Sequence, residues 1–117
     1  MKKYKLAILG CGKVANLHAQ AIGNLPNASL IAVWSDLKFW DSAEKFAAKY
    51  GVKLYSDIKT MIRENSIDLV IVCTPHPFHR AATVEAARAG ANVMVEKPLA
   101  ATLEDCDIMI NECRQAG

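Results

Sequence analysis

The sequence predicts a doubly wound α/β domain, in which helices cover both faces of a mostly parallel sheet. Short apolar runs alternate with segments of helical spacing along the whole chain, which is the order that βαβ units produce. The run 69–73 is apolar at every position, as expected of a strand that helices cover on both faces. Because crossovers between parallel strands are right-handed, the helices should fall on both sides of one sheet.

The ends of the predicted elements follow from the residues that stand there. We expect strands over 6–9, 30–34, 52–54, 69–73 and 93–95, helices over about 13–23, 42–50, 57–64 and 77–89, and a last helix opening at Thr102. Asp41 and Glu44 have capping-box spacing at the start of the second helix. Gly51 fits the end of that helix. Pro77 suits the first turn of the fourth helix, and Gly90 suits its end.

Length and composition indicate one folded domain over residues 1–117. The chain is as long as one ordinary domain and contains no linker or repeat. Hydrophobic residues make up 52% of it, which excludes general disorder. The 14 basic and 12 acidic residues are interspersed, so the chain lacks the basic face of a nucleic-acid binder. We expect no nucleic-acid partner.

The sequence also argues against a membrane segment and against a metal site. No apolar run reaches the ~18 residues of a membrane span. The apolar run after the basic opening, 6–9, is too short for a signal-peptide core. The four cysteines form no CxxC pair, so we expect reduced thiols and no bound metal. We therefore expect a cytoplasmic protein without a membrane partner.

The loop after the first strand has the glycine pattern of a dinucleotide-binding turn. Residues 10–15, GCGKVA, read as G-x-G-x-x-A between a predicted strand and a predicted helix, the Rossmann context. Gly10 permits the tight turn, Gly12 lets a pyrophosphate approach the backbone, and Ala15 lets the helix pack closely. Free amide groups at the helix start, near Lys13 and Val14, favour a phosphate. The alternative is a turn that merely uses glycine.

An acidic residue follows the second predicted strand, where this fold binds the adenosine ribose. Ser35 holds the position at which the acid is first expected, and Asp36 comes one residue later. A carboxylate there hydrogen-bonds the ribose hydroxyls of NAD and repels the extra phosphate of NADP, which an arginine would accept. No arginine follows, so we expect NAD rather than NADP. Asp36 could instead be a solvated turn residue.

Three segments in order resemble the N-terminal domain of the Gfo/Idh/MocA oxidoreductases, a family that includes glucose–fructose oxidoreductase and inositol 2-dehydrogenase. They are residues 10–19 (GCGKVANLHA), 73–79 (CTPHPFH) and 89–99 (AGANVMVEKPL). The last two segments contain the ends of predicted strands. In a doubly wound sheet, ligands bind outside the carboxyl ends of the strands. The segments should therefore lie on the same edge as the glycine loop.

The resemblance implies a catalytic and cofactor-binding role for Lys97. An ammonium at that strand end could donate a hydrogen bond to the substrate oxygen and stabilise its negative charge during hydride transfer. Glu96 would then position the cofactor ribose or the lysine. Pro75 lies in the matching 73–79 segment and is expected at the cofactor. Thr74 would contact the cofactor or cap the next helix.

Three histidines and three aromatic residues leave alternatives open. His79 matches the family histidine and would either contact the nicotinamide or pack the helix. The family usually has asparagine where this chain has His76, so the contact of that asparagine is not carried over; His76 could instead cap the helix that begins at Pro77. His18 is better explained as a structural histidine on the first helix, whose hydrogen bonds are made within the protein. The aromatic residues at the end of the second strand are expected in the core, with one of them possible beside the adenine: Trp34, Phe39 and Trp40.

The resemblance implies an NAD(P)-dependent dehydrogenase acting on a hydroxyl-bearing carbon of a sugar, cyclitol or related polyol. In the family a second α/β domain supplies most of the substrate pocket, a histidine acid/base and usually the oligomer interface. No part of residues 1–117 matches it. We expect the full-length protein to be a homo-oligomer and the 117-residue fragment to be inactive alone. The alternative is a stand-alone module that binds or senses NAD(H) without catalysis.

Overall fold

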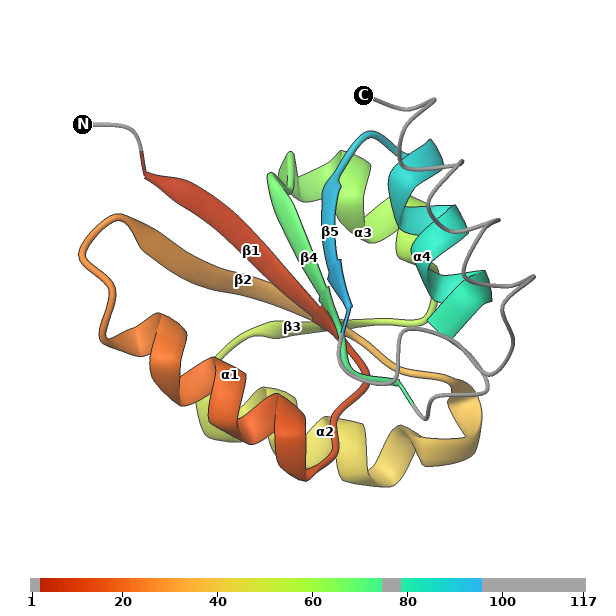
Figure 1. Cartoon of the computed structure of the whole chain (residues 1–117). Helices are drawn as coiled ribbons and strands as arrows, with labels where there is room; N and C mark the ends of the chain where they lie inside the picture. Colours follow the sequence, from red (N-terminus) through yellow and green to blue (C-terminus); the bar gives the residue numbers. More distant parts are fainter. Residues whose placement is uncertain (1–2, 75–78, 96–117) are drawn as a thin grey trace.

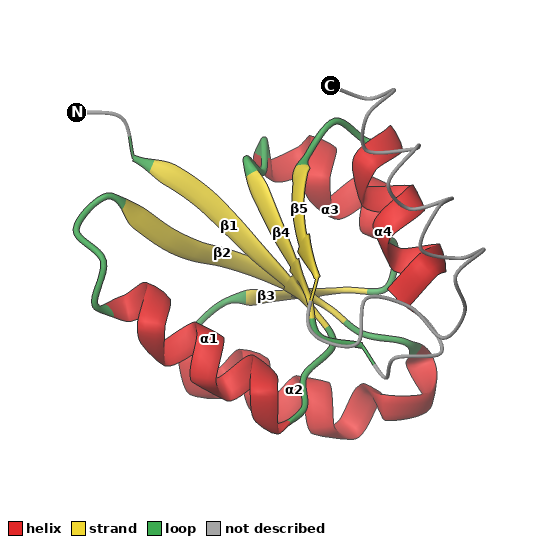
Figure 2. Ribbon diagram, viewed as in Figure 1, coloured by secondary structure: helices red, strands yellow, loops and turns green. Residues whose placement is uncertain are grey.

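The described residues form a five-stranded parallel sheet with helices on both faces, as the sequence predicts. The computed structural model describes residues 3–74 and 79–95. Its sheet has the strand order β3-β2-β1-β4-β5, and every pair is parallel. Helices α1 and α2 lie on one side of the sheet and α3 and α4 on the other (Figures 1 and 2).

The elements alternate strictly along the described chain. The strands are β1 (Tyr4–Leu9), β2 (Ala28–Trp34), β3 (Lys53–Tyr55), β4 (Leu69–Val72) and β5 (Asn92–Val95). The helices are α1 (Lys13–Gly23), α2 (Trp40–Tyr50), α3 (Ile58–Asn65) and α4 (His79–Arg88), with a short 3₁₀ turn η1 (Leu37–Phe39) before α2.

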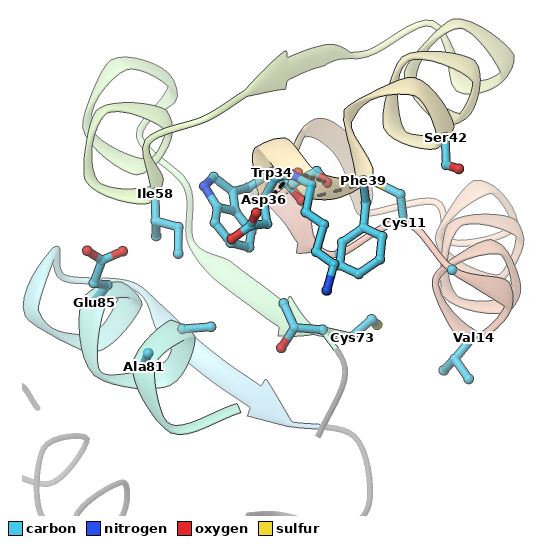
Figure 3. A pocket seen from close by; sticks show the side chains of 16 residues that line it. Cys11, Val14, Trp34, Asp36, Phe39, Ser42, Ile58, Cys73, Ala81 and Glu85 are labelled. Atoms are coloured by element: carbon cyan, nitrogen blue, oxygen red, sulfur yellow. Dashed lines mark hydrogen bonds between the residues drawn. The ribbon is translucent and has the colours of Figure 1, made fainter. Parts of the chain in front are cut away.

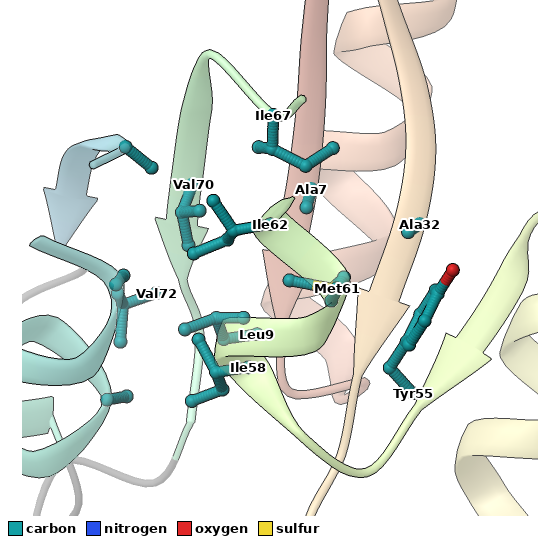
Figure 4. Packing of buried hydrophobic residues seen from close by; sticks show 13 residues of the cluster. Ala7, Leu9, Ala32, Tyr55, Ile58, Met61, Ile62, Ile67, Val70 and Val72 are labelled. Carbon is teal, nitrogen blue, oxygen red and sulfur yellow. The ribbon is translucent and has the colours of Figure 1, made fainter. Parts of the chain in front are cut away.

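Two hydrophobic cores lie on opposite faces of the same sheet. Successive strand residues point to opposite faces, so Ala7 and Leu9 enter the core under α3 and α4, whereas Leu6 and Ile8 enter the core under α1 and α2. Figure 4 shows the first of these cores. Each fully buried aliphatic side chain contributes roughly 1.5–3 kcal/mol. The double burial explains why the central strands are apolar at every position.

The register brings the carboxyl ends of the strands to one edge of the sheet. Leu9, the last residue of β1, pairs with Trp34 of β2 and with Val72 of β4, and Val72 pairs with Val95 of β5. The carboxyl ends of these four strands therefore lie side by side. Lys97 comes two residues after β5 in the sequence and lies outside the described residues.

Several predicted boundaries are confirmed by the backbone. Asp57 caps α3, because its carboxylate accepts hydrogen bonds from the Thr60 amide, at 3.0 Å, and from the Thr60 hydroxyl. Gly51 ends α2 with φ of 65°, and Gly90 follows α4 with φ of 99°. The predicted Pro77 and Thr102 helix starts lie outside the described residues.

The predicted capping box at Asp41 and Glu44 is wrong. Helix α2 begins at Trp40 and has no side-chain cap. The Asp36 carboxylate instead caps η1 by accepting a hydrogen bond from the Lys38 amide at 2.9 Å. Because η1 runs directly into α2, Asp41 already lies in the first helical turn. The other shifts are small. Strands β1 and β2 begin two residues earlier than predicted, β3 and α3 lie one residue later, β4 and α4 end one residue early, and β5 begins one residue early.

Two properties of the described residues concern membrane spans and metal ligands. None of the described helices is long and apolar enough to cross a bilayer. Histidine, cysteine and acidic side chains form no ligand cluster within the described ranges. Cys11 and Cys73 are free and half-buried. Cys106 and Cys113 lie outside the described residues.

The close approach of Gly10 to β4 predicts a large loss of stability in Gly10→Ala. Gly10 has φ of 95°, and an added Cβ would lie 2.9 Å from the Cys73 carbonyl and the Thr74 nitrogen. Strain and overlap together should cost about 2–5 kcal/mol in the free energy of unfolding, measured in urea. Gly51→Ala is the matched control, because Gly51 also has positive φ but no atom near its Cβ position. Equal losses in the two variants would contradict the steric account.

The Asp57 cap predicts a pH-dependent contribution to stability. Hydrogen bonds from the Thr60 hydroxyl and then the Thr60 amide lower the pKa of the Asp57 carboxyl. A lowered folded-state pKa means that this contribution is present above about pH 4 and is lost as pH falls through the folded value. Asp57→Asn should keep the cap and lose this pH dependence, whereas Asp57→Ala should lower the Tm at neutral pH. Thermal melts at pH 7 and pH 3 test both, and identical pH profiles for wild type and Asp57→Asn would refute the assignment.

Candidate functional site

A cleft of about 620 Å³ opens at the edge where the strands end, within the usual range for ligand sites. Three groups of described residues line it (Figure 3). The first group belongs to the loop between β1 and α1. The second runs from the end of β2 through η1 into α2. The third comes from the end of β4 and from helices α3 and α4. The lining residues are Gly10, Cys11, Gly12, Val14, Trp34, Ser35, Asp36, Lys38, Phe39, Ser42, Ile58, Cys73, Thr74, Ala81, Ala82 and Glu85.

The loop between β1 and α1 presents bare backbone to the cleft. The Gly10 amide donates to the Trp34 carbonyl at 2.8 Å, which fixes the start of the loop. Gly12 is the N-cap of α1, has no side-chain cap, and has no heavy atom within 4 Å of the place a Cβ would take. The amide groups of the first helical turn lack partners within an α-helix. The loop can therefore accept an anion against the backbone.

The Asn16 side chain holds this loop by hydrogen bonds, which the sequence analysis did not find. Its amide nitrogen donates to the Gly12 carbonyl at 3.3 Å. Its amide oxygen accepts from the Tyr50 hydroxyl at 2.8 Å and from the Lys49 ammonium at 3.3 Å. The first turn of α1 is thereby tied to the last turn of α2.

Of the two candidate ribose-binding residues, Asp36 is the one that offers a carboxylate. Ser35 is 2% exposed, its hydroxyl donates to the Asp36 carbonyl at 3.0 Å, and its amide donates to the Tyr55 carbonyl. Asp36 is exposed and lines the cleft. Lys38, two residues after Asp36, also lines the cleft and contributes a cation to it. Both signs of charge therefore occur at this part of the cleft.

Cys11 lies in the loop but is a poor nucleophile. Burial raises the pKa of the Cys11 thiol to about 11. The thiol therefore stays protonated at neutral pH, and the thiolate is the reactive form. Its sulfur lies 4.0 Å from the Trp34 carbonyl oxygen. We assign Cys11 a packing role.

The structure gathers several of the predicted site residues and leaves others undescribed. Gly10, Gly12, Val14, Ser35, Asp36 and Thr74 all line the cleft. Lys13 and His79 are the first residues of α1 and α4, but their side chains are not described. Pro75, His76, Glu96 and Lys97 lie outside the described residues. His18 is half-buried on α1 and does not line the cleft.

Other cleft residues were missed or left open by the sequence analysis. Trp34 packs against the core, as expected, and also lines the cleft, whereas Phe39 lines the cleft and is 41% exposed rather than in the core. Lys38, Ser42, Ile58 and Glu85 were not predicted. The spacing of Ala81, Ala82 and Glu85 on one face of α4 was the available signal. It required knowing which face of α4 turns toward the cleft.

Comparison with known proteins identifies the family. A family model described as an oxidoreductase family with an NAD-binding Rossmann fold, GFO_IDH_MocA, matches residues 4–117. D-apiose dehydrogenase of Paraburkholderia graminis is 32% identical, and the match covers 100% of this chain and 31% of that protein. Myo-inositol 2-dehydrogenase of Thermotoga maritima is also 32% identical, with 96% and 33% covered.

Solved structures agree with this result. The WlbA dehydrogenase from Bordetella pertussis, in complex with NADH and UDP-GlcNAcA, has a TM-score of 0.91 and 27% identity, with 100% of this chain and 35% of that chain covered. Biliverdin reductase from Synechocystis, in complex with biliverdin and NADP+, has a TM-score of 0.85 and 27% identity, with 97% and 35% covered. The chain spans about a third of the length of these relatives. It belongs to the Gfo/Idh/MocA oxidoreductase family and comprises the NAD(P)-binding Rossmann domain of that family.

Proposed function

We propose that the cleft binds NAD with its pyrophosphate against Gly12 and its adenosine ribose at Asp36. The observation that supports this most is the open backbone at Gly12, where a Cβ would meet no protein atom. The helix dipole of α1 favours negative charge at that place. Gly12 therefore fits the part of a dinucleotide that carries phosphate.

The proposed activity is hydride transfer between nicotinamide and a hydroxyl-bearing carbon of a sugar, cyclitol or related polyol. The dinucleotide supplies the hydride acceptor or donor when bound. The proposed role of Lys97 is to donate a hydrogen bond to the substrate oxygen and stabilise negative charge there. The end of β5 level with β1 and β4 supports this assignment. D-apiose, myo-inositol and scyllo-inositol dehydrogenases among the relatives support the substrate class.

Further cofactor contacts are proposed around this position. Thr74 is 6% exposed and lines the cleft where β4 ends. Pro75 and His79 follow it in the sequence, and Glu96 precedes Lys97. The relatives matched are about three times longer than this chain. We expect the 117-residue chain to bind cofactor without turning over polyols, because catalysis also needs groups that position the substrate.

Gly12→Ala should abolish tight cofactor binding without unfolding the domain. The added methyl group meets no protein atom, but it would occupy the space of the phosphate. We expect the Kd for NADH, measured by calorimetry, to rise about tenfold or more. The Tm should stay within about 2 °C of wild type.

Gly23→Ala is the matched control for Gly12→Ala. Gly23 ends the same helix and also has open space at its Cβ position, far along the helix from the loop. Its Kd for NADH should equal that of wild type. If the Kd for NADH were the same in Gly12→Ala as in the wild type, the pyrophosphate would have to bind elsewhere.

The proposed preference for NAD over NADP rests on the exposed Asp36 carboxylate in the cleft. Asp36→Asn removes the charge and keeps a side chain that caps helical turns well. We expect the ratio of the Kd values for NADPH and NADH to fall about tenfold in this variant at low salt, because charge repulsion at short range is lost. Asp41→Asn, on α2 and outside the cleft lining, should leave the ratio unchanged. A wild-type chain that binds NADPH more tightly than NADH would overturn the preference.

A further inference from the structure

The carbonyl of Gly12 accepts two hydrogen bonds, although the backbone of an α-helix supplies only one. The Asn16 amide donates to it at 3.3 Å, as the residue four positions ahead does in any α-helix. The Asn16 side-chain nitrogen donates to the same oxygen, also at 3.3 Å. Gly12 has no side chain whose packing could hold its peptide, and the space at its Cβ position is open. The direction of the Gly12 carbonyl is therefore set by Asn16.

Holding that carbonyl also aims the next backbone amide. A peptide unit is planar and trans, so the N–H of Lys13 points opposite to the carbonyl of Gly12. The carbonyl points into helix α1, toward its partner Asn16. The N–H of Lys13 therefore points out of the helix start, toward the space in front of the cleft-lining Gly12. It is one of the helix-start amides that lack a partner within the helix, and the proposed pyrophosphate would supply that partner.

The Asn16 side chain can hold the carbonyl in one orientation only, and its other partners impose that orientation. Its oxygen accepts from the Tyr50 hydroxyl at 2.8 Å and from the Lys49 ammonium at 3.3 Å. An ammonium group only donates hydrogen bonds, and a carbonyl only accepts them. Lys49 therefore needs the amide oxygen, and Gly12 needs the amide nitrogen. Exchanging the two ends of the Asn16 amide would break both contacts.

Tyr50 connects this arrangement to the hydrophobic core. Its ring packs on the ring of Phe46, with the two centroids 4.8 Å apart. Phe46 is buried in the core under α1 and α2. The Lys49 ammonium lies 5.3 Å from the centroid of the Tyr50 ring. The Tyr50 hydroxyl is therefore a fixed point, anchored by the core, against which the Asn16 amide is held.

We propose that Asn16 and Tyr50 are positioning residues for the ligand phosphate. The Tyr50 hydroxyl holds the Asn16 amide, and that amide holds the Gly12 carbonyl. The Lys13 N–H is thereby aimed at the phosphate. Neither Asn16 nor Tyr50 lines the cleft, so both act through the backbone of the loop. This inference rests on the proposed binding of a pyrophosphate at Gly12. It differs from a merely structural tie between α1 and α2, because it affects the affinity for phosphate in particular.

The test compares ADP with adenosine, which share the base and the ribose and differ in the phosphates. Displacement of fluorescent NADH gives both Kd values, and the wild-type chain should bind ADP more tightly. In Asn16→Ala the ratio of the Kd for adenosine to the Kd for ADP should fall about three- to tenfold, because one hydrogen bond to a charged group is misdirected. Tyr50→Phe keeps the ring on Phe46 and removes only the hydroxyl, so the ratio should fall about two- to fivefold.

Tyr55→Phe is the matched control, because it removes the same group from a different side-chain network. The Tyr55 hydroxyl donates to Glu64 at 3.0 Å and accepts from Asn65 at 3.0 Å. Tyr55 lies outside the cleft lining. Its replacement should lower the Tm and keep the wild-type ratio of the two Kd values.

The outcomes separate the positioning role from the phosphate site. An unchanged ratio in Asn16→Ala or in Tyr50→Phe overturns the role of the residue replaced and leaves the proposed phosphate site standing. A ratio that falls as far in Tyr55→Phe as in Tyr50→Phe also overturns the positioning role, because lost stability would then explain both. A wild-type chain that binds ADP no more tightly than adenosine overturns the proposed phosphate site and the positioning role together.

The NMR signal of the Lys13 amide gives an independent measurement. A hydrogen bond to phosphate should move the Lys13 amide proton downfield when the wild-type chain is saturated with ADP, and adenosine should leave it in place. In Tyr50→Phe the displacement at saturation should be smaller, because the amide is no longer held in the same direction. A Lys13 signal that stays in place while ADP binds, or one that moves equally in the two chains, would overturn the positioning role.

Discussion

The site depends on how closely Gly10 approaches the end of β4. No side chain fits between Gly10 and the Cys73–Thr74 peptide, so the chain can leave β1 and cross the sheet edge only with glycine there. The amide of Gly10 also holds the Trp34 carbonyl at 2.8 Å. One residue therefore fixes the ends of β1, β2 and β4 relative to one another. The floor of the cleft is built from these three ends.

Polarity varies along the cleft in a way that follows from its construction. At one end, helix α1 contributes backbone amides and carries no acidic residue in its first turn, so the local field favours anions. Asp36 and Glu85 place carboxylates toward the middle and the other end. Cys11, next to the amides, stays a neutral thiol because burial raises its pKa. A ligand with a negative centre and hydrogen-bond donors further along fits this distribution.

Local signals made much of the fold predictable from sequence. The uninterrupted apolar run at β4 predicted burial on both faces, and Gly51 and Gly90 marked helix ends through short-range geometry. The capping-box prediction at Asp41 was wrong for a reason that lies outside the few residues on which it was based. Asp36 caps η1 five residues earlier, and that turn decides where α2 begins.

The parts of the site that backbone position determines were predictable from sequence. The parts that side-chain packing determines were less predictable. The glycine loop and Asp36 follow from position relative to strands, and both line the cleft. Glu85 reaches the cleft because Ala82 and Ala86 are buried against the sheet, which fixes the rotation of α4 about its axis. That rotation depends on contacts between distant parts of the chain. Trp34 likewise faces the cleft because β2 alternates its side chains between two cores.

The bare backbone at Gly12 has a consequence for evolutionary divergence. A binding surface made of main-chain amides stays the same whichever amino acids surround it, provided that none adds bulk there. A phosphate contact made by main-chain amides, as proposed at Gly12, would tolerate changes in most neighbouring side chains, such as those expected between chains with about 30% identity. Only the residues that touch the remainder of the ligand are left to record how each lineage has specialised.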